Sequence, residues 1–154
     1  MEQLENNTSS DHSGQKKQVH RPEIFQYLDY RVFLKDWLSW KKCVLPHFSG
    51  NSFARKAKLS SHTLLGMVIR GNRNLSLTTV RSFAQALDLK SRENAYFHNL
   101  VFFNQAKKAE DREFYFNELK NANKNPPTLL KNISNYSEYI KCWYFVAIRE
   151  LVNV

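Results

Sequence analysis

A basic, amide-rich turn is the part of this sequence best suited to chemistry. The turn follows Gly71, which interrupts an apolar helical pattern. Two arginines and two asparagines flank that glycine: Arg70, Asn72, Arg73 and Asn74. Guanidinium and amide groups donate hydrogen bonds, and the guanidinium fork matches the oxygens of a phosphate. The turn is therefore predicted to lie against the phosphates of a nucleic acid, although Asn72 and Asn74 are equally typical of turn and capping geometry.

Further donors precede the turn. Three cations lie before it: Arg55, Lys56 and Lys58. Three hydroxyl groups follow them: Ser60, Ser61 and Thr63. Hydroxyls at the positive end of a helix could donate to phosphate, His62 could contact a base, and Gly66 would let the backbone approach DNA closely. A solvated helix face explains the cations equally well, and an ordinary surface histidine explains His62.

Apolar residues at helical spacing predict the elements that hold these groups. A first helix is expected from Glu23 or Asp29 to Cys43, and Pro46 ends it. A second helix is expected after Gly50. Two residues are candidates for its N-cap: Asn51 or Ser52.

The next two helices enclose the basic turn. A third helix is expected over residues 61–70, with Ser61 at its N-cap and Gly71 just past its C-terminal end. A fourth helix is expected to begin at Ser76 or Thr78, whose hydroxyl would cap it.

Two later helices are rich in aromatic residues. The inward positions of the fifth are expected to be Tyr96, Phe97, Leu100, Val101 and Phe103. A sixth is expected over about residues 111–122, with Phe114, Tyr115 and Leu119 on one face. These patterns predict an all-α fold, and residues 22–122 form its main domain.

The regions on either side of this domain differ in composition. Residues 1–21 are polar and aperiodic, which is typical of a disordered tail. Residues 123–127 contain asparagine and two prolines and are interpreted as a linker. Residues 128–154 are strongly apolar, with no later element to cover them. We therefore expect them to begin a truncated C-terminal region, and to pack on its missing part or on a second copy of the chain.

The phrases "FARKAKLSS" and "VIRGNRNLS" resemble a Cro/repressor-type helix-turn-helix domain over about residues 50–90. Ala54 matches an alanine in the second helix of that family, and residues 71–74 match the basic stretch after its third helix. The resemblance implies a five-helix domain followed by further helices, in which the third helix enters the major groove. It also implies that a homodimer reads two half-sites of duplex DNA.

Over about residues 25–152 the chain also resembles a paralogous family of bacterial proteins with a Cro-like N-terminal module and a longer C-terminal region. Phrases such as "YLDYRVFLKDW" and "YFHNLVFFNQAK" carry this second resemblance. It implies a transcription-factor-like role.

The sequence departs from the helix-turn-helix pattern in two ways, by one residue and by one spacing. Lys58 stands where the family has a glycine with positive φ, and the spacing from Ala54 to Gly71 is one residue longer than usual. The exposed positions of a helix that begins at Ser61 would be Ser61, His62, Thr63, Gly66 and Met67. None of them suits a bidentate base contact. Base readout is then weak, or is carried by Arg70 and the loop.

The remaining composition narrows the function further. The formal net charge is +9 and the pI is about 9.6, which favour an anionic partner. No secretory leader or membrane span is visible, so a cytoplasmic protein without a membrane partner is expected. Cys43 and Cys142 are expected to be buried free thiols. Neither a catalytic constellation nor a metal or cofactor motif is present in the sequence.

Two functions of different classes follow from these observations. The first is a DNA-binding transcriptional regulator that uses a helix-turn-helix. The alternative is a protein-interaction module with a Cro-like fold and no specific DNA readout. The excess of cations around residues 55–73 favours the first function. The third helix, which lacks side chains suited to bidentate base contacts, favours the second.

Overall fold

A computed structural model of the chain describes residues 20–122, which are all-helical and contain no strand. The elements are η1 (Ile24–Gln26), a short 3-10 helix, and six α-helices, α1 (Tyr30–Val44), α2 (Gly50–Lys56), α3 (Leu64–Ile69), α4 (Leu77–Ala86), α5 (Ser91–Gln105) and α6 (Ala109–Ala122). The all-α fold is thus confirmed over this range. Residues 1–19, 123–127 and 128–154, on which the predicted tail, linker and C-terminal region fall, lie outside the described residues.

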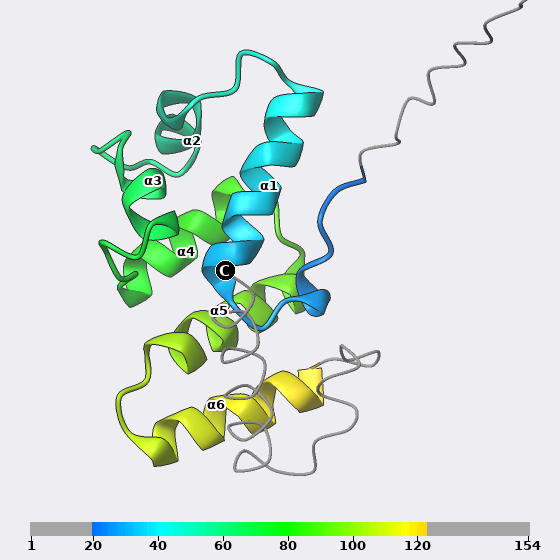
Figure 1. Cartoon of the computed structure of the whole chain (residues 1–154), viewed down its shortest axis with the longest axis vertical. Helices are drawn as coiled ribbons and strands as arrows, with labels where there is room; N and C mark the ends of the chain where they lie inside the picture. Colours follow the sequence, from blue (N-terminus) through cyan, green and yellow to red (C-terminus); the bar gives the residue numbers. More distant parts are fainter. Residues whose placement is uncertain (1–19, 123–154) are drawn as a thin grey trace, which may run out of the picture.

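The helices form two groups that share one core (Figure 1). The short helix α2 lies near the C-terminal half of α1, the end of α3 packs against the first turn of α1, and α4 runs beneath them. α5 and α6 pack along one another at the opposite end of the molecule from α2. This arrangement leaves α2, α3 and the turn that follows α3 on an outer side of the molecule, away from α6.

One face of α1 is apolar and packs into the core. The Asp29 side chain caps it by accepting a hydrogen bond from the Arg31 N–H, so the second of the two expected starts is the observed one. Its buried residues follow three- and four-residue spacing: Tyr30, Phe33, Leu34 and Trp37. The helix ends at Val44, two residues before Pro46.

An aromatic cluster joins α1, α2 and α4. The rings of Trp37 and Phe53 meet edge to face with centroids 6.0 Å apart, and Phe53 meets Phe83 at 5.0 Å in the same way. Phe48, in the loop between α1 and α2, also packs edge to face on Trp37. Because all three helices contribute rings to one cluster, burial of aromatic surface sets where α2 lies.

The observed starts of α2 and α3 differ from the expected ones. Ser49 caps α2, because its hydroxyl accepts from the Ser52 N–H, so the predicted caps Asn51 and Ser52 are wrong. α3 begins at Leu64 rather than at Ser61, and Thr63 occupies the N-cap position without a side-chain capping bond. The fourth helix is capped by Ser76, one of its two expected caps.

Three successive helices end on a left-handed residue. Lys58 has φ 53°, Gly71 has φ 81° and Asp88 has φ 55°. At each end the next N–H reaches back to the third residue before the cap, as in the bond from Asn72 N to Met67 O of 2.9 Å. Gly71 therefore ends the third helix as predicted, and Lys58 adopts the conformation that glycine holds in the helix-turn-helix pattern.

The aromatic face of α6 differs from the expected one. Phe116 and Leu119 are buried, whereas the Phe114 side chain is 60% exposed. Phe116 packs on Phe103 of α5 with ring centroids 5.9 Å apart. The five inward residues predicted for α5 are all buried.

Two smaller findings complete the fold. Cys43 is exposed near the end of α1, so its predicted burial is wrong, and Cys142 lies outside the described residues. No helix within residues 20–122 has the length and apolar character needed to cross a lipid bilayer.

Candidate nucleic-acid interface

The stretch of chain that contains α2 and α3 carries cations with no acidic residue between them in the sequence. Eight lysines and arginines and no aspartate or glutamate lie from Trp37 to Leu87. Six of these cations are exposed and form no ion pair within residues 20–122, and four of the six lie on or next to α2 and α3 or on the following turn: Arg55, Lys58, Arg70 and Arg73. Within the described residues, no ion-pair partner cancels the Coulomb attraction between these four side chains and an anion.

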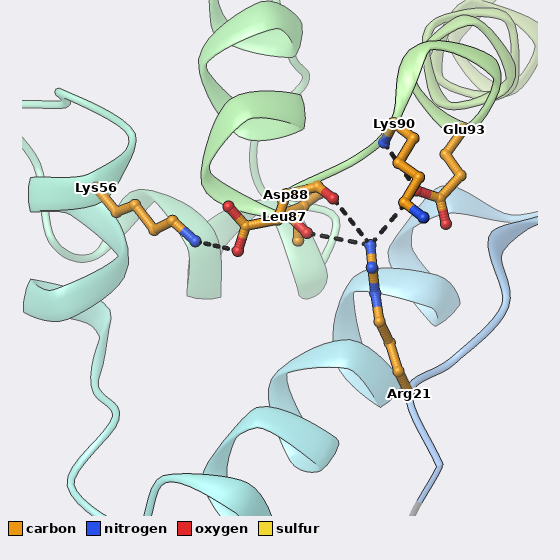
Figure 2. A network of polar contacts seen from close by, with 6 residues as sticks. All are labelled: Arg21, Lys56, Leu87, Asp88, Lys90 and Glu93. Atoms are coloured by element: carbon orange, nitrogen blue, oxygen red, sulfur yellow. Dashed lines mark hydrogen bonds and ion pairs between the residues drawn. The ribbon is translucent and has the colours of Figure 1, made fainter.

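Lys56 differs from the other predicted contact residues, because it is paired. Its ammonium group forms an ion pair with the Asp88 carboxylate just beyond the end of α4 (Figure 2). Asp88 thereby partly neutralises Lys56 and ties the end of α2 to the end of α4. Lys56 is a weaker candidate for an anion contact than Arg55, its neighbour in the sequence.

The same end of α4 holds the N-terminal segment in place (Figure 2). The Arg21 guanidinium donates to the carbonyl oxygens of Leu87 and Asp88, both at 3.3 Å, and lies 3.6 Å from the Glu93 carboxylate. A cation at a helix C-terminus stabilises the exposed carbonyls. Arg21, assigned from the sequence to the disordered tail, is thus part of the ordered domain.

Close backbone packing sets the turn between α2 and α3. A Cβ atom built on Gly50 would lie 2.5 Å from the backbone oxygen of His62, so only glycine fits there. Two of the three predicted hydroxyl donors contact each other, with 3.0 Å between the oxygens of Ser61 and Thr63. Ser60 and His62 are exposed beside them.

Replacing Gly50 with Ala is expected to destabilise the fold, because the blocking atom belongs to the backbone and cannot rotate away. Overpacking of this kind costs about 1–3 kcal/mol of unfolding free energy. Urea denaturation would measure it. Asn51→Ala, at the exposed next position of α2, is the matched control and should stay within about 0.5 kcal/mol of the parent. Equal stability of the Gly50→Ala variant and the parent would contradict the close packing.

Arg31 fixes the basic turn from the side of α1. Its Nε donates to the Val68 carbonyl at 3.2 Å, and its Nη2 donates to the Asn74 side-chain oxygen at 2.7 Å. The Val68 carbonyl also accepts from the Gly71 N–H at 3.0 Å. The Asn74 oxygen is therefore occupied, and the amide NH₂ is the part of Asn74 still free to contact an anion.

A buried residue anchors the other end of the turn. Leu75 is only 3% exposed, and the Gln105 amide at the end of α5 both donates to its carbonyl at 2.9 Å and accepts from its N–H at 2.8 Å. The same Gln105 oxygen accepts from the Tyr30 hydroxyl at 3.0 Å. The neighbouring Asn104 amide bonds in the same two-way manner to the Tyr30 N–H and the Leu28 carbonyl.

These anchors leave three of the predicted contact residues exposed on the turn. Asn72, Arg73 and Asn74 form an exposed arc between Gly71 and Leu75. Arg31 and Gln105 hold the two sides of this arc, and Asn104 fixes the start of α1. Sequence reasoning missed all three. Their partners lie far away along the chain, so no local pattern reveals them.

Burial raises the pKa of the Tyr30 phenol from its ordinary value of 10.0 to about 12. Because the neutral phenol is favoured in the folded state, its contribution to stability is complete below pH 10 and is lost as the pH rises from 10 to 12. Tyr30→Phe should remove this part of the alkaline loss, at a cost near neutral pH of about 1 kcal/mol for the hydrogen bond to Gln105. Urea denaturation between pH 8 and pH 12 would measure both effects.

Tyr27→Phe is the matched control for that measurement. Burial, followed by the hydrogen bond to Asp36, also raises the Tyr27 pKa to about 12. Tyr27 does not contact the basic turn, so its replacement should leave the Tyr30 contribution in place. Identical alkaline profiles for Tyr30→Phe and the parent would contradict the assignment to Tyr30.

Comparisons with known proteins find no family model, no curated protein and no solved structure that matches this chain.

Proposed function

We propose that this protein is a small helical domain that binds duplex DNA. The observation that carries the proposal is the set of four exposed, unpaired cations on α2, α3 and the following turn, within a stretch that has no acidic residue. Phosphate contacts need such donors on one connected surface. An accidental solvated face would be expected to include carboxylates, because Asp and Glu supply 14 residues of the chain.

Within this class, we propose a transcriptional regulator of the Cro/repressor type. α2 and α3 would be the two helices of the motif, and α3 would enter the major groove as the recognition helix. The left-handed backbone at Lys58 supports this assignment, because the turn of that motif requires positive φ there. A homodimer would place two such helices on neighbouring half-sites.

One observation favours the alternative, a protein-interaction module. Val44 and Leu45 are neighbours at the end of α1 and are 51% and 48% exposed. Two adjacent exposed aliphatic side chains suit a contact with another protein. This site is separate from the turn after α3, so it accounts for none of the cations there.

Fluorescence anisotropy with a labelled mixed-sequence duplex at 50 mM and 200 mM salt tests the proposal. Binding that weakens about 10³-fold or more between these salt concentrations would correspond to about six phosphate contacts. No binding at 50 mM salt would reject the DNA-binding function and leave the protein-interaction module.

A further inference from the structure

One face of α3 is a stripe left partly or fully open to solvent. Its members follow three- and four-residue spacing: Thr63 and Arg70 are exposed, and Gly66 and Met67 between them are half-buried. Leu65 and Val68 point the other way and are buried in the core. This α3 stripe is the surface that a recognition helix would present to the edges of bases.

The Arg70 side chain folds back along the stripe. Its Nη1 lies 3.2 Å from the point that a Cβ on Gly66 would occupy, and its Cζ lies 3.8 Å from the same point. The guanidinium therefore lies over the first turn of α3, although Arg70 itself follows the last helical residue. Gly66 leaves the space that permits this position.

Arg70 carries the only fork of paired N–H donors on the α3 stripe. The Thr63 hydroxyl contacts the hydroxyl of Ser61 and faces the Met67 sulfur at 3.9 Å. Met67 offers only a weak sulfur acceptor, and Gly66 has no side chain. Within residues 20–122 the Arg70 guanidinium has no hydrogen-bond or ion-pair partner, so its donors are free.

From this arrangement we infer that Arg70 reads a guanine through its O6 and N7 atoms, and that Gly66 is the positioning residue that makes room for the guanidinium. In the major groove guanine presents two adjacent acceptors, and the arginine fork matches them with two parallel hydrogen bonds. This inference rests on the proposed function. It adds to that function a preference for guanine at the position that Arg70 contacts. A phosphate contact by Arg70 is the competing outcome.

The test begins with sites selected from random duplexes by the full chain. Each guanine of the selected site is then replaced singly by 7-deazaguanine, which keeps base pairing but lacks the N7 acceptor. For the parent protein, one replacement should weaken binding by about 5- to 150-fold. Arg70→Lys keeps the charge but loses the fork, so it should weaken binding to the intact site similarly and should be insensitive to that replacement.

Two variants serve as comparisons. Arg73→Lys, at an exposed position of the same turn, should retain the parent's sensitivity to 7-deazaguanine. Gly66→Ala should reduce affinity for the intact site by displacing the guanidinium, while its melting temperature stays equal or rises because alanine favours the helix. Alanine is preferable here to glutamate, which would pair with Arg70 four residues later.

The outcomes separate the two proposals. If Arg70→Lys binds like the parent and keeps the parent's penalty for 7-deazaguanine, Arg70 contacts phosphate and the inference is overturned. Selected sites without a guanine common to them would overturn it as well. If the parent binds no duplex at 50 mM salt, the proposed function fails, and the guanine contact fails with it.

Discussion

Replacing Gln105 with Ala is expected to lower the free energy of unfolding by about 2–4 kcal/mol, because three hydrogen-bonding groups lose their partner. The Leu75 N–H and carbonyl both bond to the Gln105 amide, and the Tyr30 hydroxyl donates to its oxygen. Leu75 is buried, so water cannot readily replace the amide. For a domain of this size the loss corresponds to a fall in melting temperature of roughly 10–30 °C, which calorimetry would measure.

Gln85→Ala is the matched control for this prediction. Gln85 lies on the exposed face of α4, and its replacement should change stability by no more than about 0.5 kcal/mol. If the Gln105→Ala and Gln85→Ala variants have the same melting temperature, the Gln105 amide does not hold the basic turn. A large loss for Gln105→Ala alone would identify the end of α5 as the support of the turn.

Replacing Arg55 and Arg73 together with Ala is expected to weaken binding to every duplex. Both side chains are exposed and unpaired within the described range, and they lie on α2 and on the turn after α3. Each lost phosphate contact removes about 0.9 from the slope of log K against log salt concentration, so the double variant should lose about 1.8. Anisotropy titrations at four salt concentrations between 50 and 200 mM would measure the slope.

The control for this experiment is the double variant Lys107→Ala, Lys108→Ala. It removes the same amount of charge from the connection between α5 and α6, away from α2 (Figure 1). Its slope should match that of the parent. An equal loss in both double variants would mean that binding follows net charge alone, and no loss in either would exclude the two arginines from the interface.

Much of the helical framework follows from local physical chemistry. Apolar residues at three- and four-residue spacing predict α1, α4 and α5, because a helix must bury one face. Ser76 begins α4 and Gly71 ends α3 for reasons that involve only neighbouring backbone groups. Such features are predictable because the interacting atoms lie within a few residues of one another.

The start of the short third helix could not be predicted from neighbouring residues alone. Ser61 resembles an N-cap in the sequence, but its hydroxyl contacts Thr63 instead of a helical N–H, and α3 begins at Leu64. Packing of the His62 carbonyl against Gly50 constrains this turn, and that contact depends on how α2 approaches the turn. On α6, the choice between Phe114 and Phe116 is likewise made by the contact with α5.

The sequence alone therefore determined the all-helical class, the apolar faces and the cluster of cations around Gly71, because spacing and charge are local properties. Only the tertiary structure decided which cations have partners. It pairs Lys56 with Asp88 and leaves Arg55 unpaired, although the two are neighbours in the chain. It also brings Arg31 to the Val68 carbonyl across 37 residues. Such partners are chosen by the packing of helices, which places groups that are distant in sequence within hydrogen-bonding distance.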